Sequence, residues 1–234
     1  MSFQAHQDYY SLSTTTNSPF VITDSAENRT AQTANGRDEK GDIVAYEVFG
    51  EQMAPTCSYV LKADASLSSL VIGAPITVGT DKITITNVSI STSAGSPPKI
   101  DVSGEQIPAD TTHSDCKYTI PTATLVMCHH AQILWSAFTL SGSGCYLTDA
   151  NYTASGTLTK ATKDGDPVAF DISDGQLTAT VTIQQTSTTE PTLSAGTGWV
   201  ITSPLTASRA DSSLKTWTAT LSKYLTHDAA SSNT

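Results

Sequence analysis

The stretch Lys82-Ile-Thr-Ile-Thr-Asn-Val-Ser-Ile90 decides the fold class, because apolar and polar residues alternate along it. Alternation with a period of two is typical of a β-strand that buries one face. The apolar phase moves by one residue between Ile85 and Val88, and such a phase change indicates a β-bulge. The sequence therefore predicts a bent strand here, within an antiparallel sheet.

Two segments share the pattern of a hairpin with a polar loop. Val88-Ser-Ile90 is followed by a loop at 91–97 and by Pro98-Lys-Ile100; Val181-Thr-Ile183 is followed by a loop at 184–190 and by Pro191-Thr-Leu193. Both loops are too polar to bury. Each segment therefore predicts two strands joined by a projecting arm.

Other patterns predict further strands. Residues 43–49 form an apolar run that Gly50 is expected to end, and the next strand should place Cys57, Tyr59 and Leu61 on one face. An Asp-Gly pair at 164–165 between two strand-like runs predicts a hairpin. Two late strands alternate apolar with polar residues, at Leu177, Ala179, Val181 and Ile183 and at Trp217, Ala219 and Leu221.

The segment 116–140 fits a buried strand and a short helix about equally well. Any helix is expected between residues 123 and 138. We therefore expect an all-β protein, an antiparallel β-sandwich or partly closed barrel with long hairpin arms and at most one or two short helices.

The chain is expected to have three parts. Residues 1–35 form an extended N-terminal arm, 36–225 a single β domain and 226–234 a loose C-terminal tail. The arm has few large apolar side chains apart from the cluster Pro19, Phe20, Val21 and Ile22, which would pin it to a neighbouring subunit. Its order should come from that neighbour, so removal of residues 1–30 should leave a folded domain.

Composition limits the possible partners. The formal net charge is -10, from 12 Lys and Arg against 22 Asp and Glu, which disfavours binding to nucleic-acid phosphates. Hydrophobic residues make up 38%, a low share that favours a subunit completed by its neighbours. No run approaches the roughly 18 apolar residues of a membrane span, so no membrane partner is expected.

Few residues point to chemistry. His113, Cys116, Cys128, His129 and His130 include zinc-ligand types but lack the paired spacing of a structural zinc site. Ser141-Gly-Ser-Gly144 does not have the Gly-x-Ser-x-Gly order of a nucleophile elbow and is expected to be a loop. Asp164, Asp166, Asp171 and Asp174 are expected to form turns or solvated surface. We expect no catalytic, cofactor or metal site, and no enzyme activity.

Four stretches resemble virion structural proteins of tailed bacteriophages, most closely the major tail tube family: Gly41–Tyr46, Ile90–Pro98, Gly198–Pro204 and Trp217–Leu221. The resemblance implies a virion protein of the phage tail, assembled in the cytoplasm of the host bacterium. It also implies hexameric stacked rings around an acidic channel that conducts DNA without holding it, in contact with other virion proteins. On this view Asp171 and Asp174 are candidates for acidic side chains facing the lumen.

Two other classes have a similar composition. An Ig-like or jelly-roll module that decorates a capsid or binds a host surface is also rich in Ser and Thr and all-β. A lectin-like carbohydrate-binding domain is the third alternative. Particle mass separates them, because a tube protein forms rings or filaments whereas the others remain small.

Overall fold

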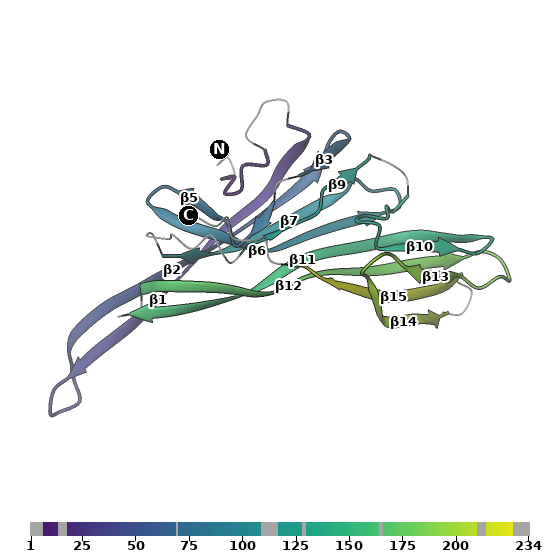
Figure 1. Ribbon diagram of the computed structural model, residues 1–234. Helices are drawn as coiled ribbons and strands as arrows, with labels where there is room; N and C mark the ends of the chain where they lie inside the picture. Colours follow the sequence, from purple (N-terminus) through teal and green to yellow (C-terminus); the bar gives the residue numbers. More distant parts are fainter. Residues whose placement is uncertain are drawn as a thin grey trace, which may run out of the picture.

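The computed structural model describes residues 7–13, 18–68, 70–108, 117–127, 130–163, 166–209 and 214–226, without the side chains of residues 49, 166 and 167 (Figure 1). The described residues form strands and no helix, and the all-β antiparallel class is confirmed. The strands are β1 (Phe20–Arg37), β2 (Ile43–Leu61), β3 (Ala65–Leu67), β4 (Val71–Ile72), β5 (Pro75–Val78), β6 (Asp81–Ser93), β7 (Lys99–Ile107), β8 (Tyr118–Thr119), β9 (Ala123–Leu125), β10 (Phe138–Ser141), β11 (Cys145–Lys163), β12 (Asp166–Gln185), β13 (Thr192–Ala195), β14 (Val200–Ser208) and β15 (Lys215–Tyr224).

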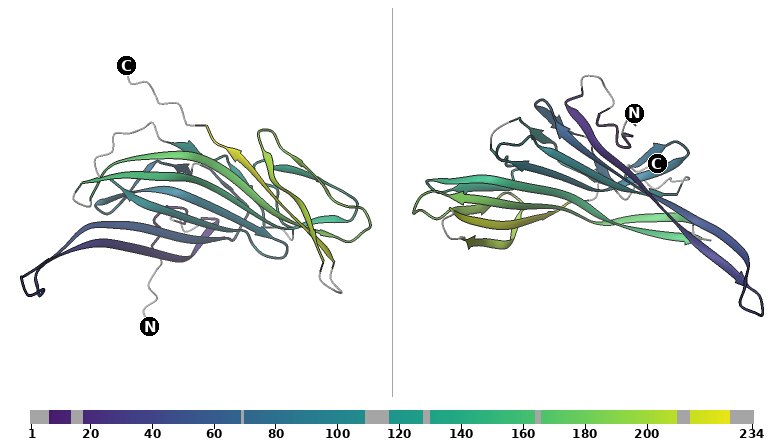
Figure 2. Two further views of the ribbon diagram at one scale, coloured as in Figure 1. Left: turned by 90° about the horizontal axis from the view of Figure 1, so that it is seen from below. Right: turned by 180° about the vertical axis from the view of Figure 1, so that it is seen from behind.

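One large sheet organises the molecule. Its strands follow the order β1-β2-β7-β6-β11-β12-β15-β14; in addition β4 and β5 pair with β6, and β8 pairs with β4. Two small sheets, β10-β13 and β3-β9, complete the architecture, which corresponds to a β-sandwich or partly open barrel. The long strands twist across one another, and the β1–β2 hairpin extends well beyond the rest (Figures 1 and 2).

The bent strand and its hairpin are confirmed. β6 pairs antiparallel with β7, and the register shifts between Ile85 and Asn87, where the apolar phase changes. Ile83 and Val88 are both fully buried on the two sides of this shift. The bulge therefore keeps the apolar side chains of the whole strand in the core.

The prediction of a second hairpin, with its loop at 184–190, is wrong. β13 pairs with β10, and the position beside β12 is taken by β15 along Gln176–Gln185. The side-chain amide of Gln185 donates hydrogen bonds to the carbonyls of Ser187 and Thr189, both 2.8 Å long. This closed turn diverts the chain out of the main sheet, and the polar loop is held by its own chain.

Gly50 does not end a strand. β2 runs continuously from Ile43 to Leu61, and Gly50 adopts a φ of 64° next to a register shift between β1 and β2. Gly50 is therefore a bulge residue, because glycine adopts this left-handed conformation without steric cost. The hairpin across 164–165 is confirmed by the pairing of β11 with β12, down to Lys163 opposite Asp166.

No helix is found among the described residues of 123–138. β9 lies at the start of this segment, and Trp135 and Ser136 have φ values of 53° and 49°, which a helix does not contain. The indole N–H of Trp135 donates to the carbonyl of Pro121 over 2.8 Å, and its ring meets Tyr152 edge to face. Residues 134–137 form a turn that Trp135 anchors.

The N-terminal region is more integrated than the sequence analysis expected. Phe20–Arg37 forms β1, which pairs with β2 of the same chain and runs past the expected boundary at residue 35. Tyr9, Tyr10 and Phe20 are each at most 7% exposed. Order in this region thus comes from the chain itself. Residues 227–234 lie outside the described residues, so the expected loose tail stays a prediction.

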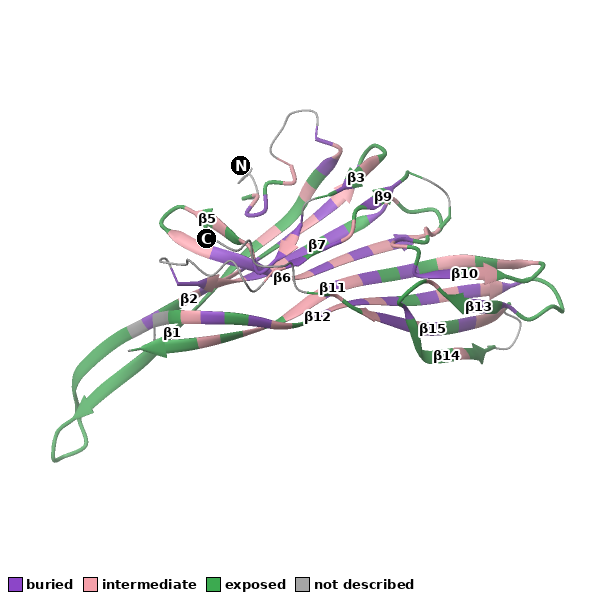
Figure 3. Cartoon of the chain, in the orientation of Figure 1, coloured by how far each residue is buried: buried purple, intermediate pink, exposed green. Residues whose placement is uncertain are grey.

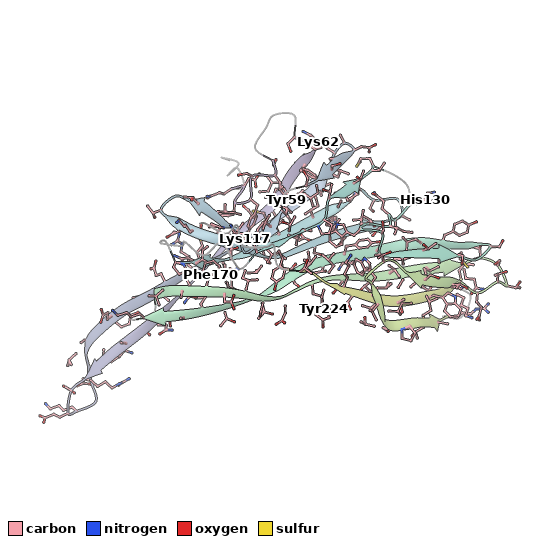
Figure 4. All side chains as sticks on the ribbon, viewed as in Figure 1. Tyr59, Lys62, Lys117, His130, Phe170 and Tyr224 are labelled. Atoms are coloured by element: carbon pink, nitrogen blue, oxygen red, sulfur yellow. The ribbon has the colours of Figure 1, made fainter. Side chains whose placement is uncertain are left out.

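The core lies on one face of the main sheet. Cys57, Tyr59 and Leu61 are buried together, as their alternation predicted. Buried and exposed residues alternate along the central strands (Figure 3). Figure 4 shows Tyr59 and Phe170 packed among other side chains, whereas Tyr224, 73% exposed, projects outward.

Candidate functional site

One face of the main sheet is polar across five neighbouring strands. Its side chains alternate with core residues such as Ala154, Leu177 and Leu221. We call this surface the polar face. It consists of Lys99, Asp101 and Ser103 on β7, Asn87, Ser89, Ser91 and Ser93 on β6, Asp149, Asn151, Thr153 and Ser155 on β11, Gln176, Thr178, Thr180, Thr182 and Gln184 on β12, and Thr216, Thr218, Thr220 and Ser222 on β15.

Short polar side chains link the strands of the polar face. The hydroxyl of Ser89 donates to the side-chain carbonyl of Asn151 over 2.8 Å, and that of Ser58 on β2 donates to Asp101. Two exposed aromatic side chains border the polar face, Tyr146 opposite Gln184 and Tyr224 opposite Gln176. Its composition makes it a hydrated wall with little affinity for apolar partners.

The charge of the polar face is acidic. Asp101 and Asp149 lie on it beside the single base Lys99. Asp171 is exposed on the same side of β12, beyond the bulge that separates Ser173 from Gln176. Asp174 is the bulge residue, with a φ of 55°, and its carboxylate accepts a hydrogen bond from the Ser173 hydroxyl. These carboxylates give the surface a negative potential.

The second candidate surface is the projecting hairpin, which we call the arm: residues 23–37 of β1 and 43–52 of β2. Nearly all of its described side chains are exposed (Figure 3). Its turn is closed by Asp38, whose carboxylate accepts the backbone N–H groups of Lys40 and Asp42, each over 2.9 Å. The arm is thus a defined two-stranded ribbon.

A polar cluster fixes the base of the arm. The ammonium group of Lys160 on β11 lies 2.9 Å from the Glu105 carboxylate and 3.0 Å from the side-chain carbonyl of Gln52. The side chain of Lys160 is only 14% exposed. Gln106 accepts the backbone N–H of Met53 over 2.8 Å. These contacts join the arm to β7 and β11, so its direction is set by the domain.

Residues 7–13 pack against the arm's inner end. The Tyr9 hydroxyl donates to Glu27 over 2.7 Å, and the Tyr59 hydroxyl donates to Asp8. Burial, reinforced by the Glu27 hydrogen bond, raises the pKa of Tyr9 to about 12. Burial raises the pKa of Tyr59 as well, with the Asp8 hydrogen bond adding to it. Both hydroxyls therefore remain protonated donors at physiological pH.

The cluster predicted to pin the N-terminal arm to a neighbour is divided between core and surface. Phe20 is 6% exposed and packs in the core of its own chain, whereas Val21 is 41% exposed. The carbonyl of Pro19 accepts the backbone N–H of Lys62. Ile22 is half-buried. Contact with another subunit through these residues stays a prediction.

Sequence reasoning missed the exposed apolar residues of the arm. Val44, Tyr46 and Val48 are 66%, 64% and 48% exposed. They belong to the run 43–49, whose mostly apolar character, interrupted by Glu47, is typical of a buried strand. Residues 23–42, part of which pairs with the run 43–49 in the hairpin, form a long polar stretch. This stretch was the available signal that the hairpin has no core to face.

The residues considered for chemistry do not form a centre in the described structure. His113, Cys116, Cys128, His129 and Asp164 lie outside the described residues, as does the side chain of Asp166. Where the structure describes the chain, no group of three His, Cys, Asp or Glu side chains is placed to hold a metal. Ser141 ends β10, and residues 142–144 form the turn to β11, with φ values of 131° at Gly142 and 72° at Gly144.

Among the described residues no helix is long and apolar enough to cross a membrane. No protein-family model matches the sequence, and no curated protein is significantly similar to it.

Proposed function

We propose that the protein is a structural subunit of a tailed-bacteriophage virion, and specifically a tail tube protein. In this proposal hexameric rings of the chain stack around a channel that conducts DNA, with the polar face toward the lumen. The protein acts as a building block and not as an enzyme. It belongs to the phage tail and is assembled in the host cytoplasm with other virion proteins.

The observation that carries the proposal is the polar face. A wall that lets DNA slide must not bind it, and a surface built mainly of Ser, Thr, Asn and Gln, with Lys99 as its one cation, offers few contacts to phosphates. The carboxylates of Asp101, Asp149 and Asp171 repel phosphate groups. A ring of such faces would therefore bound a hydrated, weakly repulsive channel.

The exposed arm gives independent support. A ribbon with apolar side chains in water favours association with another molecule, and a closed ring or filament supplies such partners along its whole length. The low hydrophobic share of the chain agrees with a subunit that is completed by its neighbours.

Light scattering and negative-stain imaging of the purified full chain test the proposal. The expected result is rings or filaments with a central channel. A particle that stays at the mass of one or three subunits at every concentration and salt would overturn it, and would favour the capsid-decoration or host-binding module instead.

A further inference from the structure

The arm carries an apolar row on one side. The exposed apolar side chains Val44, Tyr46 and Val48 of β2 form what we call the arm stripe. Tyr46 and Val48 share one face of the ribbon because strand side chains alternate, and Val44 is the extra residue at the register shift between β1 and β2. The opposite face carries Ala45 and Glu47, whereas the register shift turns Ile43, opposite Arg37, to the face of Tyr46. An apolar row that remains in water promotes association, so the arm stripe has the character of a docking surface.

The chain cannot cover the arm stripe with its own far end. β1 and β14 are the two ends of the strand order in the main sheet. The arm projects at one end of the elongated molecule and β14 lies at the other (Figures 1 and 2). Contact between these two regions therefore requires two molecules.

The β14 end offers a matching surface. β14 pairs on one side with β15 and is the last strand of the sheet among the described residues. Val200 is 62% and Ile201 36% exposed. An open strand edge provides unpaired backbone groups, and exposed apolar side chains beside it provide contact area.

Charge distinguishes the two ends. Residues 20–61, which span β1 and β2, contain seven carboxylates and three bases, whereas residues 190–226 contain three bases and two carboxylates. Arg209 and Lys215 line a shallow depression together with Leu214 at the end of β14 and the start of β15, and Lys215 is also paired with Glu190 over 3.0 Å. In a chain of net charge -10 this region attracts the acidic arm of another copy.

We propose that the arm of one copy docks, through the arm stripe, on the open β14 edge of a second copy. The inference rests on the proposed function, for which it names the partner surface. The contact joins two different surfaces, so each docked copy still presents one free arm and one free edge. Repetition then closes a ring or extends a filament.

Two variants, each altered on one of the two docking surfaces, test the docking. Val44→Asp with Tyr46→Asp and Val48→Asp removes the arm stripe, and Val200→Asp alters the β14 edge. Each variant alone should remain at the mass of one subunit under conditions where the unaltered chain assembles. A one-to-one mixture should form particles of two subunits and no larger, because each pair retains a single intact contact.

A matched control places the same added charge on the other face of the arm, with Gln32→Asp, Ala34→Asp and Ala45→Asp. This variant should assemble, and circular dichroism should show the same strand content for all variants. A mixture that stays at one subunit, or a stripe variant that assembles normally, would overturn the docking. The second result leaves the proposed function intact, whereas an unaltered chain that never assembles overturns both.

Discussion

At the scale of single residues, two tyrosines determine how the N-terminal segment is held. The hydroxyls of Tyr9 and Tyr59 donate to Glu27 and Asp8, which stand on the surface side of an otherwise apolar contact. A hydrogen bond to a carboxylate is stronger than a neutral one when its surroundings are partly dry. The segment 7–13 is therefore attached by charge-assisted bonds as well as by buried rings.

Acid should weaken this attachment. The Tyr9 hydrogen bond, followed by that of Arg29, lowers the pKa of Glu27. Because the folded pKa lies below the unfolded one, the stabilisation is present above the unfolded value and is lost as pH falls through the folded value. Glu27→Gln should reduce the free energy of unfolding by about 1 kcal/mol at pH 7, and by less at acid pH.

Urea unfolding at pH 7 and pH 3 measures the effect of Glu27→Gln. Glu39→Gln at the exposed arm turn is the control and should change stability little at either pH. An equal loss at both pH values would contradict a role for the ionised carboxylate.

Gly175 is fixed by a close approach. A Cβ atom there would lie 2.4 Å from the ring of Tyr118, which packs on the core side of the β12 bulge. Gly175→Ala should therefore destabilise the fold by roughly 1–3 kcal/mol. Thermal unfolding measures the loss, with Ser173→Ala on the outer side of β12 as the control; equal stability of the two variants would refute the steric account.

At the scale of elements, the sequence correctly predicted the features that follow from local patterns of polar and apolar residues and from turn residues. The β6 bulge, the face shared by Cys57, Tyr59 and Leu61, and the hairpin across 164–165 follow from local patterns, and all three are present. Each of these features is determined by residues that are close together in the sequence. Side-chain alternation and the residue types of a turn therefore predict them directly.

Partner choice between strands was less predictable. β13 pairs with β10, about fifty residues earlier in the chain, and no local pattern distinguishes this from the expected pairing with β12. Trp135 likewise forms a left-handed turn because its indole reaches Pro121, a tertiary contact that periodicity does not contain. The exposure of the arm stripe depends on the absence of a facing layer, so it was missed for the same reason.

The expectation that residues 1–30 are dispensable for folding does not hold on the structure. Their removal would delete Tyr9, Tyr10, Phe20 and more than half of β1. A shorter excision separates folding from assembly. Replacing residues 31–51 by Asn-Gly keeps the pair Thr30 and Gln52 at the end of a tight hairpin.

This excision should leave the free energy of unfolding within about 1 kcal/mol of the original, because most of the removed side chains are exposed. Assembly should be lost, since the arm stripe goes with the arm. Chemical denaturation and light scattering report the two properties separately. Filaments formed by the excised chain would show that the arm is not the contact.

At the scale of the whole molecule, the sheet separates two environments. Its core face holds the apolar side chains, and the polar face holds Ser, Thr and acidic residues across five strands. A wide sheet with one wet face needs no second layer on that side, and so can border water or a channel. The arm and the β14 edge lie at opposite ends of the same sheet (Figure 1).

Reversing charge on the polar face should make the assembly retain DNA. Asp101→Lys, Asp149→Lys and Asp171→Lys together replace three phosphate-repelling groups by three attractive ones. Fluorescence anisotropy with a short duplex should then detect binding that weakens as salt rises. The unaltered chain is the control and should retain little DNA; equal retention by the two would argue against a special role of the polar face.

A cryo-electron-microscopy reconstruction of the assembled full chain tests the central claim most directly. The account predicts a channel whose wall is the polar face, with Asp101, Asp149 and Asp171 directed at the axis and the arm of each copy on β14 of the next. A reconstruction with the polar face on the outside, or a sample that contains only single subunits, would contradict it.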